Sequence, residues 1–209
     1  MTTAVYFDLD FTLLQYTDDF EAIFGRAIPD APDGAYERYV EELIDAFGRL
    51  SATPHRDGID AVLSEFDVGI ATDVAVQRYY QSELDATTVP AQTRSALERV
   101  ATHHPTGILT NGAPKMQRAK VEGHELDSVV DAVVVSNDPD VAARKPAGEI
   151  FAAAEDALPA DEYVYVGDDY DEDIVGARRA GWDALHVGDD GPEDARRVAS
   201  VDDAVARIV

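Results

Sequence analysis

Five short apolar runs divide this chain, and helical patterns lie between most of them. Each run has the length of a buried strand, and strands that alternate with helices are typical of βαβ units, which build a parallel sheet. Right-handed crossovers then place helices on both faces of the sheet. We therefore expect an α/β fold with a Rossmann-like parallel sheet of about five strands. The predicted strands are residues 4–7, 107–109, 132–135, 163–166 and 184–187.

A helical insert separates the first predicted strand from the second. Between about Gln15 and Pro90 the sequence contains no convincing strand, and apolar residues recur at helical spacing, as in the segment from Tyr36 to Leu50. Unstructured connections of this length are uncommon in compact domains, and long ones are usually functional lids. We therefore predict a Rossmann-like core from residues 1–14 and 91–209, with a small all-helical cap domain, residues 15–90, inserted into it.

Composition limits the kind of partner that the chain can have. Its 42 acidic and 17 basic residues give a net charge of −25, which argues against a nucleic-acid partner that needs a basic surface. Only Lys115, Lys120 and Lys145 are lysines, and low lysine with high aspartate favours a surface adapted to high salt over an ordinary acidic cytosolic protein. The sequence gives no indication of oligomeric state.

The chain contains no cysteine, which excludes disulfides, thiolate metal sites and a cysteine nucleophile. No apolar stretch approaches the roughly 20 residues that a membrane span needs. The first ten residues lack the basic region of a signal peptide. We therefore expect a cytoplasmic protein without a membrane partner.

Two aspartates, Asp8 and Asp10, directly follow the first predicted strand. In a chain this acidic, chance alone produces roughly four D-x-D triplets, so the pattern by itself is weak and also fits a turn or a helix cap. Its position is more informative. In open α/β sheets, ligands bind outside the carboxyl ends of the strands.

The next three predicted strands also end in polar residues. Thr110 and Asn111 fit either a tight turn or a phosphate site at a helix start. Lys145 fits a solvated side chain or an ammonium that neutralises a nucleophile and a phosphoryl group. Asp168 and Asp173 fit an acidic helix start or, with Asp8, ligands of a hard cation such as Mg²⁺.

Together these segments resemble the haloacid dehalogenase superfamily of hydrolases. The matching motifs are D-x-D-x-T with Asp8, Asp10 and Thr12, then T-N, R-K-P and G-D-x-x-x-x-D, and the insert occupies the place of that superfamily's cap. The stretches ILTNGAPKMQRAKVE and KPAGEIF are similar to phosphatase members that act on nucleotide or sugar monophosphates. The resemblance therefore implies a Mg²⁺-dependent phosphatase for a small phosphate monoester.

The resemblance also implies a role for each matched residue. Asp8 is the expected nucleophile and forms an aspartyl phosphate, while Asp10 is the expected acid and base. Thr110, the Asn111 backbone and Lys145 are expected to stabilise the phosphoryl oxygens. Mg²⁺ is expected at Asp8, the backbone carbonyl of Asp10 and Asp168, with Asp173 behind these ligands. The dehalogenases of the superfamily lack the acid at Asp10.

Three positions depart from the common pattern of the superfamily without removing a catalytic group: Phe11 stands where glycine is frequent, Ala147-Gly148 replaces Asp-Pro, and Asp169 replaces Ser or Thr. Substrate choice is expected to lie in the cap. Its candidate residues are Arg26, Arg38, Arg49, His55 and Arg56, although each also fits a solvated surface residue.

Other functions are compatible with parts of this pattern. A phospho-acceptor receiver domain also combines aspartates, a threonine and a lysine on a parallel sheet, but it has neither the long insert nor the acidic motif after the fourth strand. A dehalogenase-type hydrolase for a non-phosphate substrate and a binding protein that keeps the fold are the remaining alternatives.

Overall fold

The computed structural model of the chain describes residues 1–188, 192 and 195–209. Residues 189–191 and 193–194 lie outside this range. Within it, six parallel strands form one sheet in the order β5-β4-β1-β6-β7-β8. The strands are β1 (Thr3–Phe7), β4 (Thr106–Thr110), β5 (Ala132–Val135), β6 (Glu162–Gly167), β7 (Asp183–Val187) and β8 (Arg197–Val198).

This order confirms the expected Rossmann-like sheet. All five predicted strands are present. The sixth, β8, has two residues, too few for an apolar run to be visible in the sequence. The strand order reverses between β1 and β6, which are neighbours in the sheet although about 155 residues separate them. Such a switch point opens a crevice at the carboxyl ends of the two strands.

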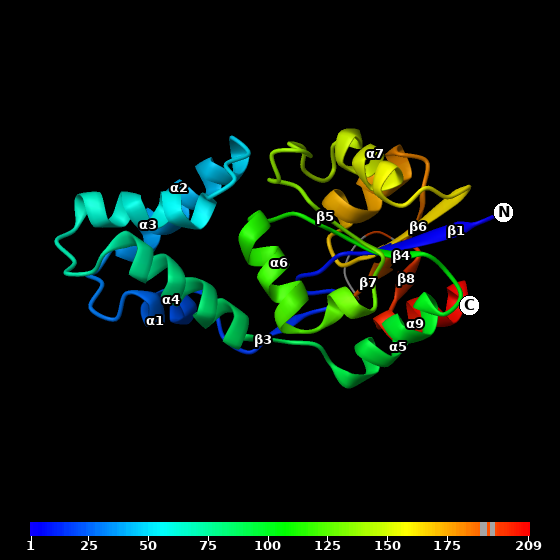
Figure 1. The fold of residues 1–209 in the computed structure, drawn as a ribbon, viewed down its shortest axis with the longest axis horizontal. Coiled ribbons are helices and arrows are strands. Elements are labelled where there is room, and N and C mark those ends of the chain that lie inside the picture. Colours follow the sequence, from blue (N-terminus) through cyan, green and yellow to red (C-terminus); the bar gives the residue numbers. More distant parts are fainter. Residues whose placement is uncertain (189–191, 193–194) are drawn as a thin grey trace.

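Helices cover both faces of the sheet, with α7 on one side and α5 and α9 on the other (Figure 1). Because successive strand residues point to opposite faces, Val5 and Phe7 of β1 pack with α5 and α9, whereas Tyr6 packs with α7. The helical segments of this layered domain are α5 (Ala91–Ala101), α6 (Pro114–Gly123), η1 (Leu126–Ser128), α7 (Gly148–Ala157), η2 (Tyr170–Val175), α8 (Gly176–Arg179) and α9 (Val201–Ile208).

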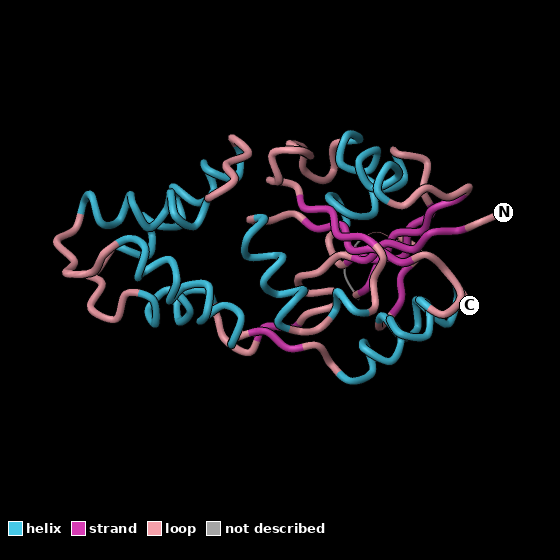
Figure 2. The backbone as a smooth tube through the Cα atoms, viewed as in Figure 1, coloured by secondary structure: helices cyan, strands magenta, loops and turns pink. Residues whose placement is uncertain are grey.

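The insert between β1 and β4 forms a separate helical body beside the sheet (Figure 2). Its helices are α1 (Phe20–Ala27), α2 (Ala35–Gly48), α3 (Pro54–Glu65) and α4 (Thr72–Asp85). They enclose their own apolar core, which contains Ile23, Tyr39, Ile59 and Tyr79. On the side of the sheet domain, α4 packs against α6.

Two very short strands lie in the stretch for which the sequence showed no strand. They are β2 (Gln15–Tyr16) and β3 (Thr87–Thr88), which pair antiparallel. They form because the chain leaves the sheet domain and returns to it at the same place, so the two backbones run side by side. No helix among the described residues is both long and apolar enough to span a bilayer.

Candidate active site

The predicted site residues converge at the carboxyl edge of the sheet, beside the switch point. Asp8 follows β1, and its backbone N–H donates to Val166 of β6. Thr110 ends β4, and Asp168 follows β6. Asp8, Thr110 and Lys145 are all buried. The topology thus brings together side chains from four distant segments.

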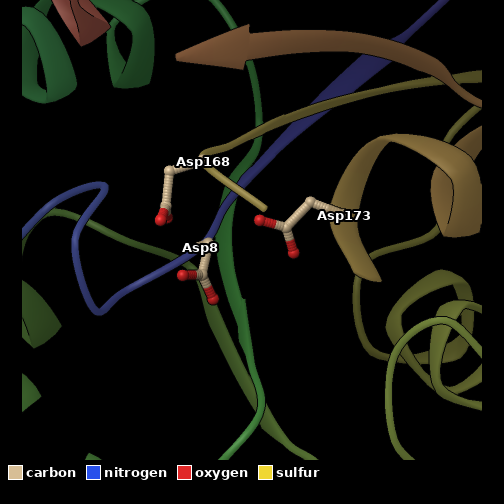
Figure 3. A group of neighbouring side chains, drawn as sticks. All are labelled: Asp8, Asp168 and Asp173. Atoms are coloured by element: carbon tan, nitrogen blue, oxygen red, sulfur yellow. The ribbon is translucent and has the colours of Figure 1, made fainter. Parts of the chain in front are cut away.

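Three carboxylates form a cluster at this edge, with ligand atoms of Asp8, Asp168 and Asp173 within 4.8 Å of one another (Figure 3). Burial raises the pKa of Asp8 well above its usual range, although Lys145 acts in the opposite direction. Burial also raises the pKa of Asp168. Carboxylates at this spacing repel one another when ionised, so the cluster favours a bound cation. Its oxygen-only donor set fits Mg²⁺.

Lys145 lies between two of these carboxylates. Its Nζ donates to Asp8 Oδ1 at 2.7 Å, to Asp173 Oδ1 at 2.6 Å and to the Tyr165 hydroxyl at 2.7 Å. Burial alone would lower the pKa of Lys145, but the Asp173 and Asp8 carboxylates outweigh it and raise the pKa, so the ammonium stays charged.

Asp173 has a partner on each oxygen. Besides Lys145, it accepts a hydrogen bond of 3.1 Å from the backbone N–H of Asp169. A side chain on Gly167 would collide with this carboxylate, which explains glycine at the end of β6. Asp173 is thus arranged to hold Lys145 and the Asp169 backbone, whereas the Asp168 carboxylate accepts a hydrogen bond of 2.7 Å from Thr12 Oγ1.

Asn111 fixes the backbone of Lys145. Its Oδ1 accepts from the Lys145 N–H at 2.9 Å, and its Nδ2 donates to the Lys145 carbonyl at 3.1 Å. The same Nδ2 donates to Glu172 Oε2 at 2.6 Å. Nothing in the sequence indicated this contact, because Glu172 is one acidic residue among many acidic neighbours.

The side chain of Asp10 lies outside the three-carboxylate cluster and faces the cap. Its Oδ1 accepts from Lys120 Nζ at 2.9 Å and lies 3.0 Å from the Tyr16 hydroxyl, and its Oδ2 accepts from Gln117 Nε2 at 2.7 Å. Burial alone would raise the pKa of Asp10, but Lys120 and the hydrogen bonds lower it.

Lys120 also joins the core to the cap, because its buried Nζ forms a 2.6 Å ion pair with Glu83 of α4. Sequence reasoning assigned no role to Lys120, Gln117 or Glu83. The available signal was the rarity of lysine in the chain, and Lys120 is one of three.

Phe11 shows why its position favours glycine. Its φ of 63° lies in the left-handed region, where residues with a Cβ are strained. Its ring is 55% exposed and stacks on Tyr16 with 5.0 Å between the ring centroids. The residue therefore projects an aromatic surface between the aspartates and the cap.

The cap candidates separate into two groups. The four arginines form ion pairs with cap carboxylates; examples are Arg26 with Asp18 at 2.9 Å and Arg49 with Asp57 at 2.9 Å. Arg38 pairs with Glu42, and Arg56 with Asp73. His55 alone among the five candidates lines the pocket between the cap and the sheet domain.

Residues 2–181 match the sequence model of the haloacid dehalogenase-like hydrolases. The chain belongs to this family and is a hydrolase. Family membership leaves the receiver-domain alternative without support.

Individual proteins similar to this hydrolase include both phosphatases and dehalogenases. It is 28% identical over 195 residues to a glyceraldehyde 3-phosphate phosphatase of Pyrococcus abyssi, covering 87% of this chain and 79% of the relative. A haloacid dehalogenase-type (HAD) phosphatase structure from Thermococcus onnurineus is 25% identical, with a TM-score of 0.70 and coverage of 100% and 98%. An L-2-haloacid dehalogenase of Xanthobacter autotrophicus shares the fold at 18% identity, with a TM-score of 0.71 and coverage of 100% and 98%.

Proposed function

We propose that this hydrolase is a Mg²⁺-dependent phosphatase that cleaves a small phosphate monoester, of the nucleotide or sugar monophosphate class, through an aspartyl phosphate on Asp8. The observation that carries the proposal is the position of the Asp8 carboxylate, held by Lys145 at the switch point and beside Asp168. Asp10, two residues further on, supplies the acid that distinguishes the phosphatases from the dehalogenases in the resemblance drawn from the sequence. The phosphatase names of the relatives support the same activity.

In the first step, an oxygen of Asp8 attacks phosphorus, and the bond from phosphorus to the ester oxygen breaks. Asp10 gives a proton to the leaving oxygen, which departs as an alcohol. Because Lys120 and the hydrogen bonds of Asp10 lower its pKa, Asp10 has to take up this proton when the substrate binds. In the second step, water attacks the aspartyl phosphate while the Asp10 carboxylate takes its proton. The bond to Asp8 then breaks and inorganic phosphate leaves.

The remaining residues stabilise charge on the phosphoryl oxygens. Lys145 is positioned beside the nucleophile, and the Thr110 hydroxyl and the Asn111 N–H lie at the adjacent strand end. Mg²⁺, which Asp8, Asp168 and the Asp10 carbonyl would hold, supplies further neutralisation of negative charge. Preorganised groups of this kind account for most of the catalysis in phosphoryl transfer.

We also propose that residues 15–90 act as a cap that closes over this edge, with residues 1–14 and 91–209 as the catalytic core. Closure would exclude water from the aspartyl phosphate until the alcohol has left. The pairing of β2 with β3 marks the connection about which the cap would move.

Replacement of Asp8 tests the proposal. Wild-type protein with Mg²⁺ should hydrolyse p-nitrophenyl phosphate, and Asp8→Asn should abolish turnover while its thermal unfolding stays cooperative. Unchanged turnover in Asp8→Asn would refute the role of Asp8. Release of chloride from 2-chloropropionate, with no release of phosphate from any ester, would favour the dehalogenase alternative.

Removal of the metal tests the cation site separately. EDTA should abolish turnover, and added Mg²⁺ should restore it. Mg²⁺ should also raise the melting temperature of the wild type, because a ligand that binds only the folded state stabilises it. Asp168→Asn should lose this shift. A shift that persists in Asp168→Asn would show that the cation binds elsewhere.

A further inference from the structure

A pocket of about 270 Å³ lies between the cap and the carboxyl edge of the sheet. It extends from Asp10 and Asn111 in the core to residues of α2, α3 and α4. Its volume is near the lower end of the range for ligand pockets, about 300–1,000 Å³. The leaving group of a substrate held at Asp8 would occupy this space, so the volume of the pocket limits the size of the leaving group.

The walls of the pocket are mainly aromatic and apolar. Phe11 stacks on Tyr16, and the ring of Phe20 meets that of Tyr16 at a tilt, with 5.0 Å between the ring centroids in each pair. Tyr36, Leu43 and Phe47 contribute from α2. Aromatic side chains hold flat rings by offset or edge contacts. A sugar, in contrast, needs a hydrogen-bonding partner for each hydroxyl that it buries.

The pocket offers no site for a second anion. Among the described residues that line it, Lys120 carries the only positive charge, and its Nζ is already bound to Asp10 and Glu83. Burial lowers the pKa of His55 to about 4, so this ring is neutral at pH 7. The four cap arginines are outside the lining and are paired with carboxylates. An additional phosphate or carboxylate on the leaving group would therefore be buried without a counter-charge.

Glu83, which lines the pocket, has one carboxylate oxygen without a hydrogen-bond partner in the described part of the chain. Glu83 Oε2 is buried without a hydrogen bond in the described part of the chain, and its distance of 4.0 Å from His55 Nε2 is too long for one. The other oxygen of Glu83 is occupied by Lys120. A buried carboxylate oxygen without a donor is unfavourable, so a ligand that supplies an O–H or N–H would be preferred over one that does not.

We propose that the natural leaving group is a small, uncharged aromatic group that stacks against Phe11 and Tyr16 and donates an O–H or N–H to Glu83. This proposal rests on the phosphatase activity proposed above. It favours the phosphate monoester of a hydroxylated aromatic alcohol, or of a nucleoside whose base supplies the ring, over a sugar phosphate or a bisphosphate.

A substrate panel with matched variants tests this. The wild type should give higher kcat/KM for the 3- or 4-hydroxyphenyl phosphate than for phenyl phosphate, and higher values for aryl esters than for glucose 6-phosphate or glyceraldehyde 3-phosphate. Turnover of thymidine 5′-monophosphate tests whether the aromatic ring of the leaving group is a nucleoside base or a simple aryl alcohol. Glu83→Gln should reduce the ratio of hydroxyphenyl to phenyl ester by about tenfold. Using a ratio removes any general effect of this variant on the Lys120 pair.

Two neighbouring residues of α2 provide a further control. Leu43 lines the pocket, whereas Ile44 is 63% exposed outside the lining. Leu43→Ser should lower kcat/KM for phenyl phosphate by about tenfold, and Ile44→Ser should leave it unchanged. Faster turnover of the sugar phosphates, or an unaltered ratio in Glu83→Gln, would overturn the leaving-group proposal alone. Absence of turnover with every ester would overturn the phosphatase proposal and this one with it.

Discussion

The ammonium of Lys145 donates a hydrogen bond of 2.7 Å to the carboxylate of Asp8, a residue 137 positions earlier in the chain. The same ammonium holds Asp173, so one positive charge serves two buried carboxylates. The nucleophile proposed here is therefore kept in place by a residue that would also contact the phosphoryl group, and the two roles of Lys145 can be separated by experiment.

Lys145→Met should lower kcat by about 100- to 1,000-fold, the usual effect of removing one preorganised charge-stabilising donor. It should also lower the free energy of unfolding by about 3 kcal/mol, because two buried carboxylates lose their counter-charge. Steady-state kinetics and urea unfolding measure the two effects. The double variant Lys145→Met/Asp173→Asn should regain part of the stability but none of the activity. Recovery of activity would mean that Lys145 only neutralises Asp173.

Lys120→Met should destabilise the fold by about 3–5 kcal/mol, because the buried Glu83 and the partly buried Asp10 would lose their shared counter-charge. Lys115 is a matched control, since it lies on the same helix but is exposed. Lys115→Met should change stability by less than about 0.5 kcal/mol. Urea denaturation of both variants measures the difference. Equal effects at the two positions would contradict the importance of the buried pair.

His55 should make the fold sensitive to acid. Burial lowers the pKa of His55 to about 4 in the folded state, whereas an unfolded histidine titrates near 6.5. The unfolded chain therefore binds more protons in this range. The stability linked to the neutral ring is complete above about pH 6.5 and is lost as the pH falls to about 4, by on the order of 3 kcal/mol.

The comparison of His55→Gln with the wild type isolates this contribution from that of the carboxylates. The unfolding free energy of His55→Gln should vary less steeply between pH 6.5 and 4 than that of the wild type. His103→Gln, at an exposed position, should follow the wild-type curve. Parallel curves for the wild type and His55→Gln would exclude His55 as the source of the acid sensitivity.

We propose that the net charge of −25 reflects adaptation to high salt. Mutual repulsion of surface carboxylates destabilises the compact state, and the Debye length falls from about 10 Å at 0.1 M to about 3 Å at 1 M salt. The melting temperature should therefore rise by several degrees between 0.1 and 2 M KCl. Sucrose, which stabilises without screening, serves as the control solute. A melting temperature that does not rise with KCl would contradict the proposal.

Five of the six strands, and the position of the polar residues that follow them, could be predicted from the sequence because both depend on local patterns. Apolar runs indicated β1, β4, β5, β6 and β7. The polar residues that follow these strands lie close together because parallel strands end at the same edge of the sheet. The pair of Lys120 with Glu83 could not be predicted in this way. It depends on how α4 packs on α6, and Glu83 is indistinguishable in the sequence from the many acidic residues at the surface.

Local pattern also failed where an element is very short or depends on a distant partner. β8 has two residues, and β2 with β3 forms only because the two ends of the insert meet. Glu172 gains its contact with Asn111 through the packing of η2 beside the loop that contains Lys145. Such contacts follow from the tertiary fold and leave no periodic signal.

The buried ion pair between Lys120 and Glu83 restricts which helical caps can replace this one. Every group proposed for the chemistry comes from the core, so a chimaera carrying another helical cap would retain Asp8, Asp10, Lys145 and Asp168. It would also retain Lys120, whose ammonium now shares its charge with a cap carboxylate. If the donor cap has no acidic residue opposite α6, Asp10 becomes the only carboxylate that pairs with Lys120. A successful graft in this protein therefore needs one matched residue as well as a matching shape.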